Sequence, residues 1–142
     1  MSANATVGTY LAHWRIGSGA PGAPTLDLKT VVSAPTHHLQ GAGDITQAVN
    51  PPINVHTLVS GNYSQMGTAV LISLTGTAQQ GGMQNFQCHI HLPNGWNQNG
   101  AASYRYLSGN TWHDVENVTA TAIHTEQAMT SSSGSAGSSR RG

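Results

Sequence analysis

The sequence predicts an all-β fold, for three reasons. Apolar and polar residues alternate with a period of two along most of the chain, as they do in strands with one buried face. Segments rich in Gly, Pro and Asn interrupt this alternation at short intervals, and no segment has the convincing apolar spacing of a crossover helix. These features favour a single antiparallel β-sandwich, with a closed barrel as the alternative topology.

The first two strands are expected at Thr9–Ile16 and Thr25–Ser33, because the even-numbered residues of each segment form a mainly apolar face. The segment between them, 17–24, is rich in Gly and Pro and cannot continue a strand. A loop of this length suits a connection that crosses between two sheets, which is why the sandwich is preferred to the barrel.

The next strands are expected at Thr36–Val49, Asn54–Tyr63 and Ala69–Ala78. Gly41 and Gly43 indicate that the first of these is bent by a bulge or by the close approach of a neighbouring strand. The apolar run Ala69–Ile72 predicts that the third is a central strand covered on both sides.

The clearest strand is Gln84–Leu92, where apolar and polar residues alternate strictly. Ala102–Leu107 and Thr111–Val115 are expected to form a hairpin. In the following stretch, Glu116–His124, the apolar residues Val118 and Ala122 have helical spacing, but the β-branched residues favour a separate last strand.

A chain of 142 residues is expected to form one domain. The expected organisation is a flexible N-terminus at 1–8, a β domain at 9–125 and a Ser/Gly-rich tail at 126–142. The tail is predicted to be disordered because it has too little apolar surface to offset the entropy of ordering.

Five Lys or Arg residues and five Asp or Glu residues give the chain no net charge. Arg15, Lys29 and Arg105 are scattered, so neither nucleic acid nor a membrane surface is expected as a partner. A weakly charged surface provides little repulsion between molecules, which makes a homodimer an expected outcome.

Cys88 is the only cysteine, which excludes an intrachain disulfide. The first residues lack the basic and apolar regions of a signal peptide, and no apolar run is long enough to span a bilayer. A cytoplasmic location is therefore expected, with signal-independent secretion as the alternative.

The eight histidines outnumber the acidic residues, which is the one compositional indication of a metal site. His89 and His91 lie two apart on the clearest strand, so both project from one face. They could bind zinc with a third ligand from His56, or from His37 or His38. The alternative is that they are ordinary polar residues on the outer face of the strand.

No catalytic residues and no cofactor-binding residues are predicted. Cys88 lies on the apolar face of its strand and is expected to be a buried thiol. The chain has no Gly-x-Ser-x-Gly motif, and its glycine clusters lack the Lys of a phosphate-binding loop.

Aromatic and amide residues predict a second kind of site, a surface for binding a sugar or a protein. Trp96 lies in a loop with Asn94 and Asn97, whose amides could bond to hydroxyl groups beside the ring. Tyr104 and Trp112 extend this predicted surface. The alternative is that Trp96 folds back as a lid over the core.

The run Gly41–Pro52 with Val55–Thr57, and later Ala102–Tyr106 with Trp112-His113, resembles a family of small uncharacterised bacterial domains. The similarity to this family covers roughly Val7 to Thr121. The chain also resembles a proteobacterial protein noted as a seroreactive antigen. The resemblance implies a β-rich fold and no catalytic residues, since none are described for the family.

We therefore expect a non-enzymatic bacterial β domain that binds or assembles through polar and aromatic surface, with recognition by antibodies as an incidental property. A metal-binding module or metal-dependent enzyme is the first alternative, and a carbohydrate-binding module is the second. The expected partner is an unidentified protein or glycan.

Overall fold

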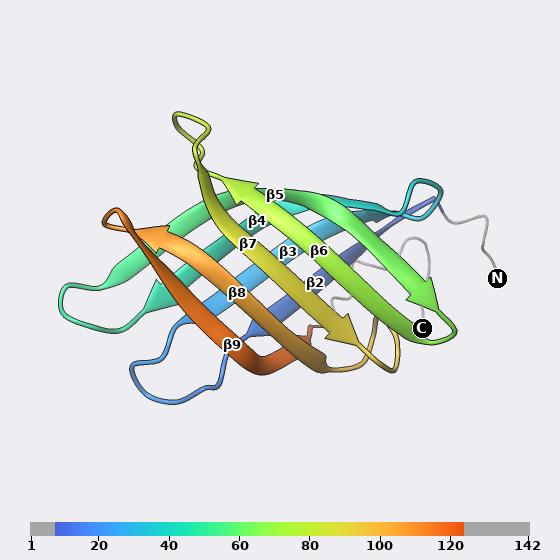
Figure 1. The fold of residues 1–142 in the computed structure, drawn as a ribbon. Helices are drawn as coiled ribbons and strands as arrows, with labels where there is room; N and C mark the ends of the chain where they lie inside the picture. Colours follow the sequence, from blue (N-terminus) through green and yellow to red (C-terminus); the bar gives the residue numbers. More distant parts are fainter. Residues whose placement is uncertain (1–7, 124–142) are drawn as a thin grey trace, which may run out of the picture.

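A computed structural model describes residues 8–123, and all the regular structure in this range is β (Figure 1). The strands are β2 (Thr9–Ile16), β3 (Thr25–Ser33), β4 (His38–Gln47), β5 (Ile53–Met66), β6 (Ala69–Thr77), β7 (Gln84–Leu92), β8 (Gly100–Ser108) and β9 (Thr111–Ala122). This confirms the all-β prediction. The predicted tail at 126–142, residues 1–7 and residues 124–125 lie outside the described range.

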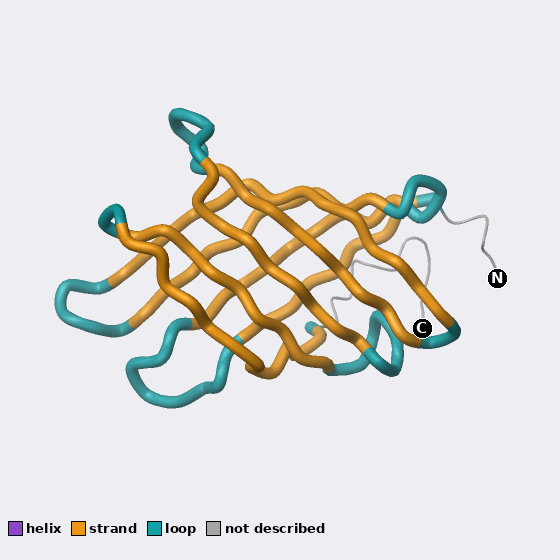
Figure 2. The backbone as a smooth tube through the Cα atoms, viewed as in Figure 1, coloured by secondary structure: helices purple, strands orange, loops and turns teal. Residues whose placement is uncertain are grey.

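Each strand pairs antiparallel with the next strand along the chain, and β9 pairs with β2, so the sheet closes into a barrel. The connections lie alternately at the two ends of the barrel (Figure 2). The closing seam is short, because Trp14, Arg15 and Ile16 are the β2 residues in register with β9 in the described part of the chain. Two backbone hydrogen bonds, Gly17 N to Thr119 O and Ile123 N to His13 O, extend it at its ends.

The barrel, not the preferred sandwich, is the topology of this sheet. The long segment 17–24 does not cross between two sheets, because it joins β2 to β3 and these strands pair directly in an eight-residue register from Thr9↔Ser33 to Ile16↔Leu26. Loop length alone therefore gave the wrong topology, since a long loop can also close a simple hairpin.

The interior of the barrel is apolar and the outer face is mainly polar. Strand alternation sends every second side chain inward, and these residues form one buried cluster whose largest members include Trp14, Phe86 and Tyr106. Burial of an aliphatic or aromatic side chain of this kind contributes about 1.5–3 kcal/mol. The strand β6 was expected to be covered on both sides, but Leu71 is 51% exposed on its outer face, so β6 follows the same alternation.

Two glycines allow neighbouring strands to approach closely. A Cβ atom on Gly41 would collide with the carbonyl oxygen of Lys29, and one on Gly61 would collide with that of Ser73. The close approach predicted for the strand containing Gly41 is therefore confirmed, and glycines at such positions help a sheet to curve into a barrel.

A β-bulge interrupts the pairing of β8 with β9. Ala102 pairs with Val118 and Tyr104 with Val115, so Ser103 alone faces both Glu116 and Asn117. The bulge explains the misleading helical spacing in the sequence, because the inward positions step by three residues, from Val115 to Val118. The two strands predicted at Thr111–Val115 and Glu116–His124 are consequently one strand, β9.

Candidate functional site

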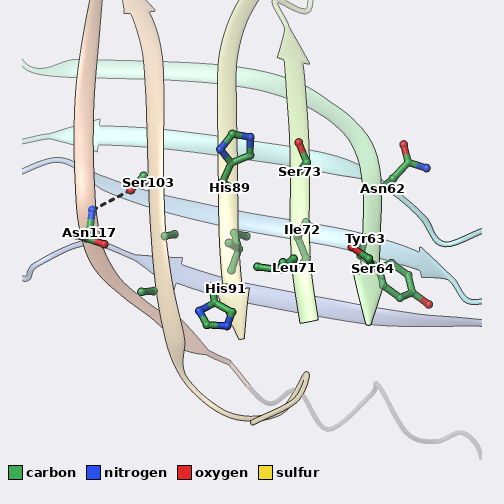
Figure 3. Close-up of a pocket in the computed structure, with 13 residues that line it drawn as sticks. Asn62, Tyr63, Ser64, Leu71, Ile72, Ser73, His89, His91, Ser103 and Asn117 are labelled. Atoms are coloured by element: carbon green, nitrogen blue, oxygen red, sulfur yellow. Dashed lines mark hydrogen bonds between the residues drawn. The ribbon is translucent and has the colours of Figure 1, made fainter. Parts of the chain in front are cut away.

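A groove with a volume of about 580 Å³ lies on the outer face of the barrel (Figure 3). It crosses β5, β6, β7, β8 and β9. Its lining is Asn62, Tyr63, Ser64, Leu71, Ile72, Ser73, His89, Ile90, His91, Ala101, Ala102, Ser103 and Asn117.

The groove follows from the register of the strands. Asn62 stands opposite Ser73, Ser73 opposite His89, and His89 opposite Ser103, which gives one row of polar side chains across four strands. Neighbouring strands are about 4.8 Å apart, so this polar row is about 14 Å long. Every member presents a hydrogen-bonding group to the outer surface.

A second row lies beside the polar row and makes the groove hollow. Leu71 stands opposite His91, and His91 opposite Ala101. The small side chains of Ala101, Ser103 and Ser73 leave open space between the larger imidazole and leucine side chains. The result is a depression with polar groups along one line and, beside it, a mixed line in which Leu71 and Ala101 stand on either side of His91.

The β9 bulge forms one end of the groove. Asn117 has a positive φ of 54°, and its backbone N–H donates a hydrogen bond of 3.0 Å to the hydroxyl oxygen of Ser103. Asparagine tolerates this left-handed conformation better than most residues. The bulge therefore fixes Ser103 and adds Asn117 to the groove lining.

The structure places the predicted metal residues His89 and His91 on one outer face, both in this groove. Figure 3 shows their rings turned away from one another along β7. His56 is not brought to them: it lies six residues along β5 from Asn62, about 20 Å away along the strand. Within residues 8–123, no group of three or more His, Cys, Asp or Glu residues is arranged to hold a metal ion.

The other two histidines considered as third ligands are also separated from the pair. His38 belongs to the same cross-strand row as His89 but stands on β4, three strands away. His37 stacks on Tyr63 with ring centroids 4.9 Å apart. The predicted three-histidine site is thus not assembled in this structure.

Trp96 is half-buried and packs against the core, as the alternative interpretation of this residue predicted. Its ring makes edge contacts with Tyr10 and Tyr63, at centroid distances of 5.6 Å and 4.8 Å, and lies 6.1 Å from Trp14. These aromatic residues cover one end of the barrel.

The predicted aromatic binding surface is not a single surface. Tyr104 is only 4% exposed and lies inside the barrel, where burial raises the pKa of its hydroxyl. Asn94 and Asn97 are exposed in the β7–β8 connection, whereas Trp112 is 37% exposed beyond the β8–β9 turn, at the other end of β8. The alternation of side chains along β8 places Tyr104 inward, so its assignment to the binding surface was wrong.

A second outer surface, not anticipated from the sequence, carries much of the charge of the described chain. On the outer face Arg15 stands opposite Asp27, Asp27 opposite Asp44, and Asp44 opposite His56. His13 Nε2 lies 2.5 Å from Asp27 Oδ1, and His56 Nδ1 lies 2.7 Å from Asp44 Oδ1. The alternation of side chains predicts only that these residues face outward. Their proximity depends on the register of the four strands.

The described range has no helix of a length and apolarity that could cross a membrane. A protein-family model described as a domain of unknown function, DUF1842, matches residues 7–112, which include β2 to β8 and the start of β9. A comparison with curated proteins gives no match.

Proposed function

The chain belongs to the DUF1842 family of domains of unknown function, and we propose its function from the geometry of the groove. We propose that the protein binds a short glycan chain without catalysing a reaction on it. The observation that carries this proposal is the polar row Asn62, Ser73, His89 and Ser103, which lies beside a second row where Leu71 and Ala101 are exposed on either side of His91.

A glycan suits this arrangement for two reasons. Its hydroxyl groups both donate and accept hydrogen bonds, as do the amide, hydroxyl and imidazole groups of the polar row. Its C–H faces can cover Leu71 and Ala101 in the second row. The groove volume of about 580 Å³ also lies in the range of small-molecule sites in proteins.

The lining favours binding over hydrolysis of such a ligand. Glycoside hydrolysis commonly uses two carboxyl groups on either side of the scissile bond. None of the described residues that line the groove is Asp or Glu. The two imidazoles are available as hydrogen-bonding partners for the ligand.

The proposal is tested by filling the groove. Ser73 is exposed at the centre of the polar row, so Ser73→Phe places an aromatic ring in the groove at a strand position that accepts aromatic residues. We expect glycans that bind the native protein on a glycan array to lose binding to this variant. Gln40→Phe, which adds the same ring on the exposed outer face of β4, is the matched control.

Single truncations provide a graded version of the same test. His89→Ala and His91→Ala each remove one hydrogen-bonding side chain, and each is expected to weaken binding by about fivefold, the equivalent of about 1 kcal/mol. Retention of full affinity in Ser73→Phe and both histidine variants, measured by isothermal titration calorimetry, would exclude the groove as the binding site.

Zinc binding by His89 and His91 is the competing proposal, supported by their shared face. Such a site would need ligands in addition to this pair, because zinc in proteins takes three or four protein ligands. Native mass spectrometry in the presence of zinc distinguishes the two: stoichiometric zinc that disappears in His91→Ala supports the metal site.

Bacterial origin, antibody recognition and homodimer formation, all expected from the sequence, remain part of the proposal. Antibody recognition would be an incidental property of exposed loops, and immunoblotting with immune sera tests it. For a homodimer, the low net charge is the supporting observation. Sedimentation analysis over a range of protein concentrations tests it.

A further inference from the structure

A second, smaller hollow of about 170 Å³ adjoins the groove along β7, β8 and β9. It shares His89 and Ser103 with the main groove, and its other outward residues are Gln87, Arg105, Asp114 and Glu116. The two hollows therefore meet at one pair of side chains, and a chain-like ligand in the main groove would extend into the second hollow.

The β9 bulge determines which residues face each hollow. In a regular strand, the adjacent residues Glu116 and Asn117 would project to opposite faces. Because both stand opposite Ser103 in the bulge, both are exposed on the outside of the barrel. Asn117 lines the main groove and Glu116 lines the second hollow.

The second hollow has an excess of negative charge. The Arg105 guanidinium lies 3.5 Å from Asp114 Oδ1 and 4.6 Å from the ring centroid of Trp112, so its charge is already engaged by two partners. Glu116 has no ion-pair partner among residues 8–123. One uncompensated carboxylate therefore stands at the end of a polar, otherwise uncharged groove.

We propose that this hollow is a subsite for a cationic amino group, and that the ligand of the groove is an amino sugar oligomer. The inference rests on the proposed glycan-binding function and specifies the class of glycan. The polar row binds the hydroxyl groups, and Glu116 accepts a charge-assisted hydrogen bond from the ammonium group of a sugar residue next to Ser103.

A lysine-containing peptide carries the same cation, but the groove favours a sugar. An extended peptide bound to a sheet normally pairs its main-chain groups with a free strand edge. In the groove the interior strands β6, β7 and β8 are paired on both sides, so they offer the ligand side chains rather than backbone groups. Hydroxyl groups spaced along a sugar chain match such side chains directly.

The experiment compares glucosamine oligomers with N-acetylglucosamine oligomers of equal length by isothermal titration calorimetry at low ionic strength. N-acetylation removes the positive charge of the amino group and preserves all the hydroxyl groups. We expect the glucosamine oligomer to bind the native protein about tenfold more tightly. In Glu116→Gln this preference should disappear, while the affinity for the acetylated oligomer should stay unchanged.

Asp44→Asn is the matched control, because it removes one exposed carboxylate from β4, on another part of the outer face. The Asp44→Asn variant should keep the preference for the glucosamine oligomer. This result would show that the net charge of the protein alone does not cause the preference. Equal affinities of the native protein for both oligomers would overturn the cationic subsite and leave glycan binding intact. Failure of both oligomers, together with an empty glycan array, would overturn the proposed function as well. Binding of a lysine peptide but of neither oligomer would overturn the assignment of the ligand class.

Discussion

Asp27 and Asp44 face one another directly across β3 and β4, two carboxylates in register on a chain that has only five acidic residues. Like charges at directly opposite positions of an antiparallel pair are destabilising. Each carboxylate forms a hydrogen bond with a histidine on the strand that lies on its far side. Asp27 pairs with His13 on β2, and Asp44 pairs with His56 on β5. The two histidines therefore hold the carboxylates toward different strands.

His13→Ala is expected to lower the free energy of unfolding by about 1 kcal/mol, because it removes the hydrogen bond to Asp27 and leaves that carboxylate facing Asp44. Urea unfolding measures the change. In the double variant His13→Ala with Asp44→Asn, part of the loss should be recovered, since the opposing charge is gone. An equal or larger loss in the double variant would contradict the role assigned to the facing carboxylates.

Trp96→Ala is expected to destabilise the barrel by about 2 kcal/mol, because the ring covers one barrel end through its contacts with Tyr10 and Tyr63. Trp112→Ala is the control: its ring lies on the outer face beneath Arg105, so its loss should change stability by no more than about 0.5 kcal/mol. Thermal unfolding of both variants checks the comparison. If the two variants lose similar stability, Trp96 does not act as a lid.

The strand positions were predictable because alternation is a local property of the sequence. The boundaries of Thr9–Ile16, Thr25–Ser33 and Gln84–Leu92 agree with the structure. The bulge at Glu116 and Asn117 was not predictable from this pattern, since one inserted residue changes the period from two to three at a single step. Closure into a barrel depends on the pairing of β2 with β9, which are distant in sequence, and no local pattern specifies it.

The candidate site was predictable only in part, for the same reason. The spacing of His89 and His91 placed both on one outer face, as the structure has them. Their neighbours in the groove, Ser73 and Ser103, come from adjacent strands and become neighbours through register. Serine is common on exposed strand faces, so neither residue carried a signal in the sequence.

Gly61→Ala is expected to destabilise the fold by about 3 kcal/mol or more, because the added Cβ atom would meet the backbone carbonyl of Ser73, which cannot move without disturbing the pairing of β5 with β6. Gly8→Ala is the control, since a Cβ atom there has no neighbouring atom within 4 Å. Chemical denaturation of the two variants gives the comparison. A Gly61→Ala barrel as stable as the native one would show that the close strand approach is not required.

Tyr104→Phe is expected to stabilise the protein at neutral pH by about 1 kcal/mol. The Tyr104 hydroxyl is buried and has no hydrogen-bond partner among the described residues, so its removal eliminates a desolvated polar group while the ring is kept. Tyr106→Phe is the matched control, because the Tyr106 hydroxyl donates a hydrogen bond of 3.4 Å to Gln47 Oε1 and its loss should not stabilise.

The same substitution should change the response to alkaline pH. Burial, with smaller contributions from Tyr106 and Cys88, raises the pKa of Tyr104 above its ordinary value of 10.0. In the unfolded chain the phenol ionises near pH 10 while the folded protein keeps it neutral, so stability falls as pH rises above 10. Tyr104→Phe removes this contribution, which reduces the loss by up to about 1.4 kcal/mol per pH unit. Urea unfolding at pH 7 and at pH 11 measures the stabilisation at neutral pH and the smaller loss at alkaline pH. If Tyr104→Phe were less stable than the native protein at pH 7, the Tyr104 hydroxyl would have a hydrogen-bond partner in the folded protein.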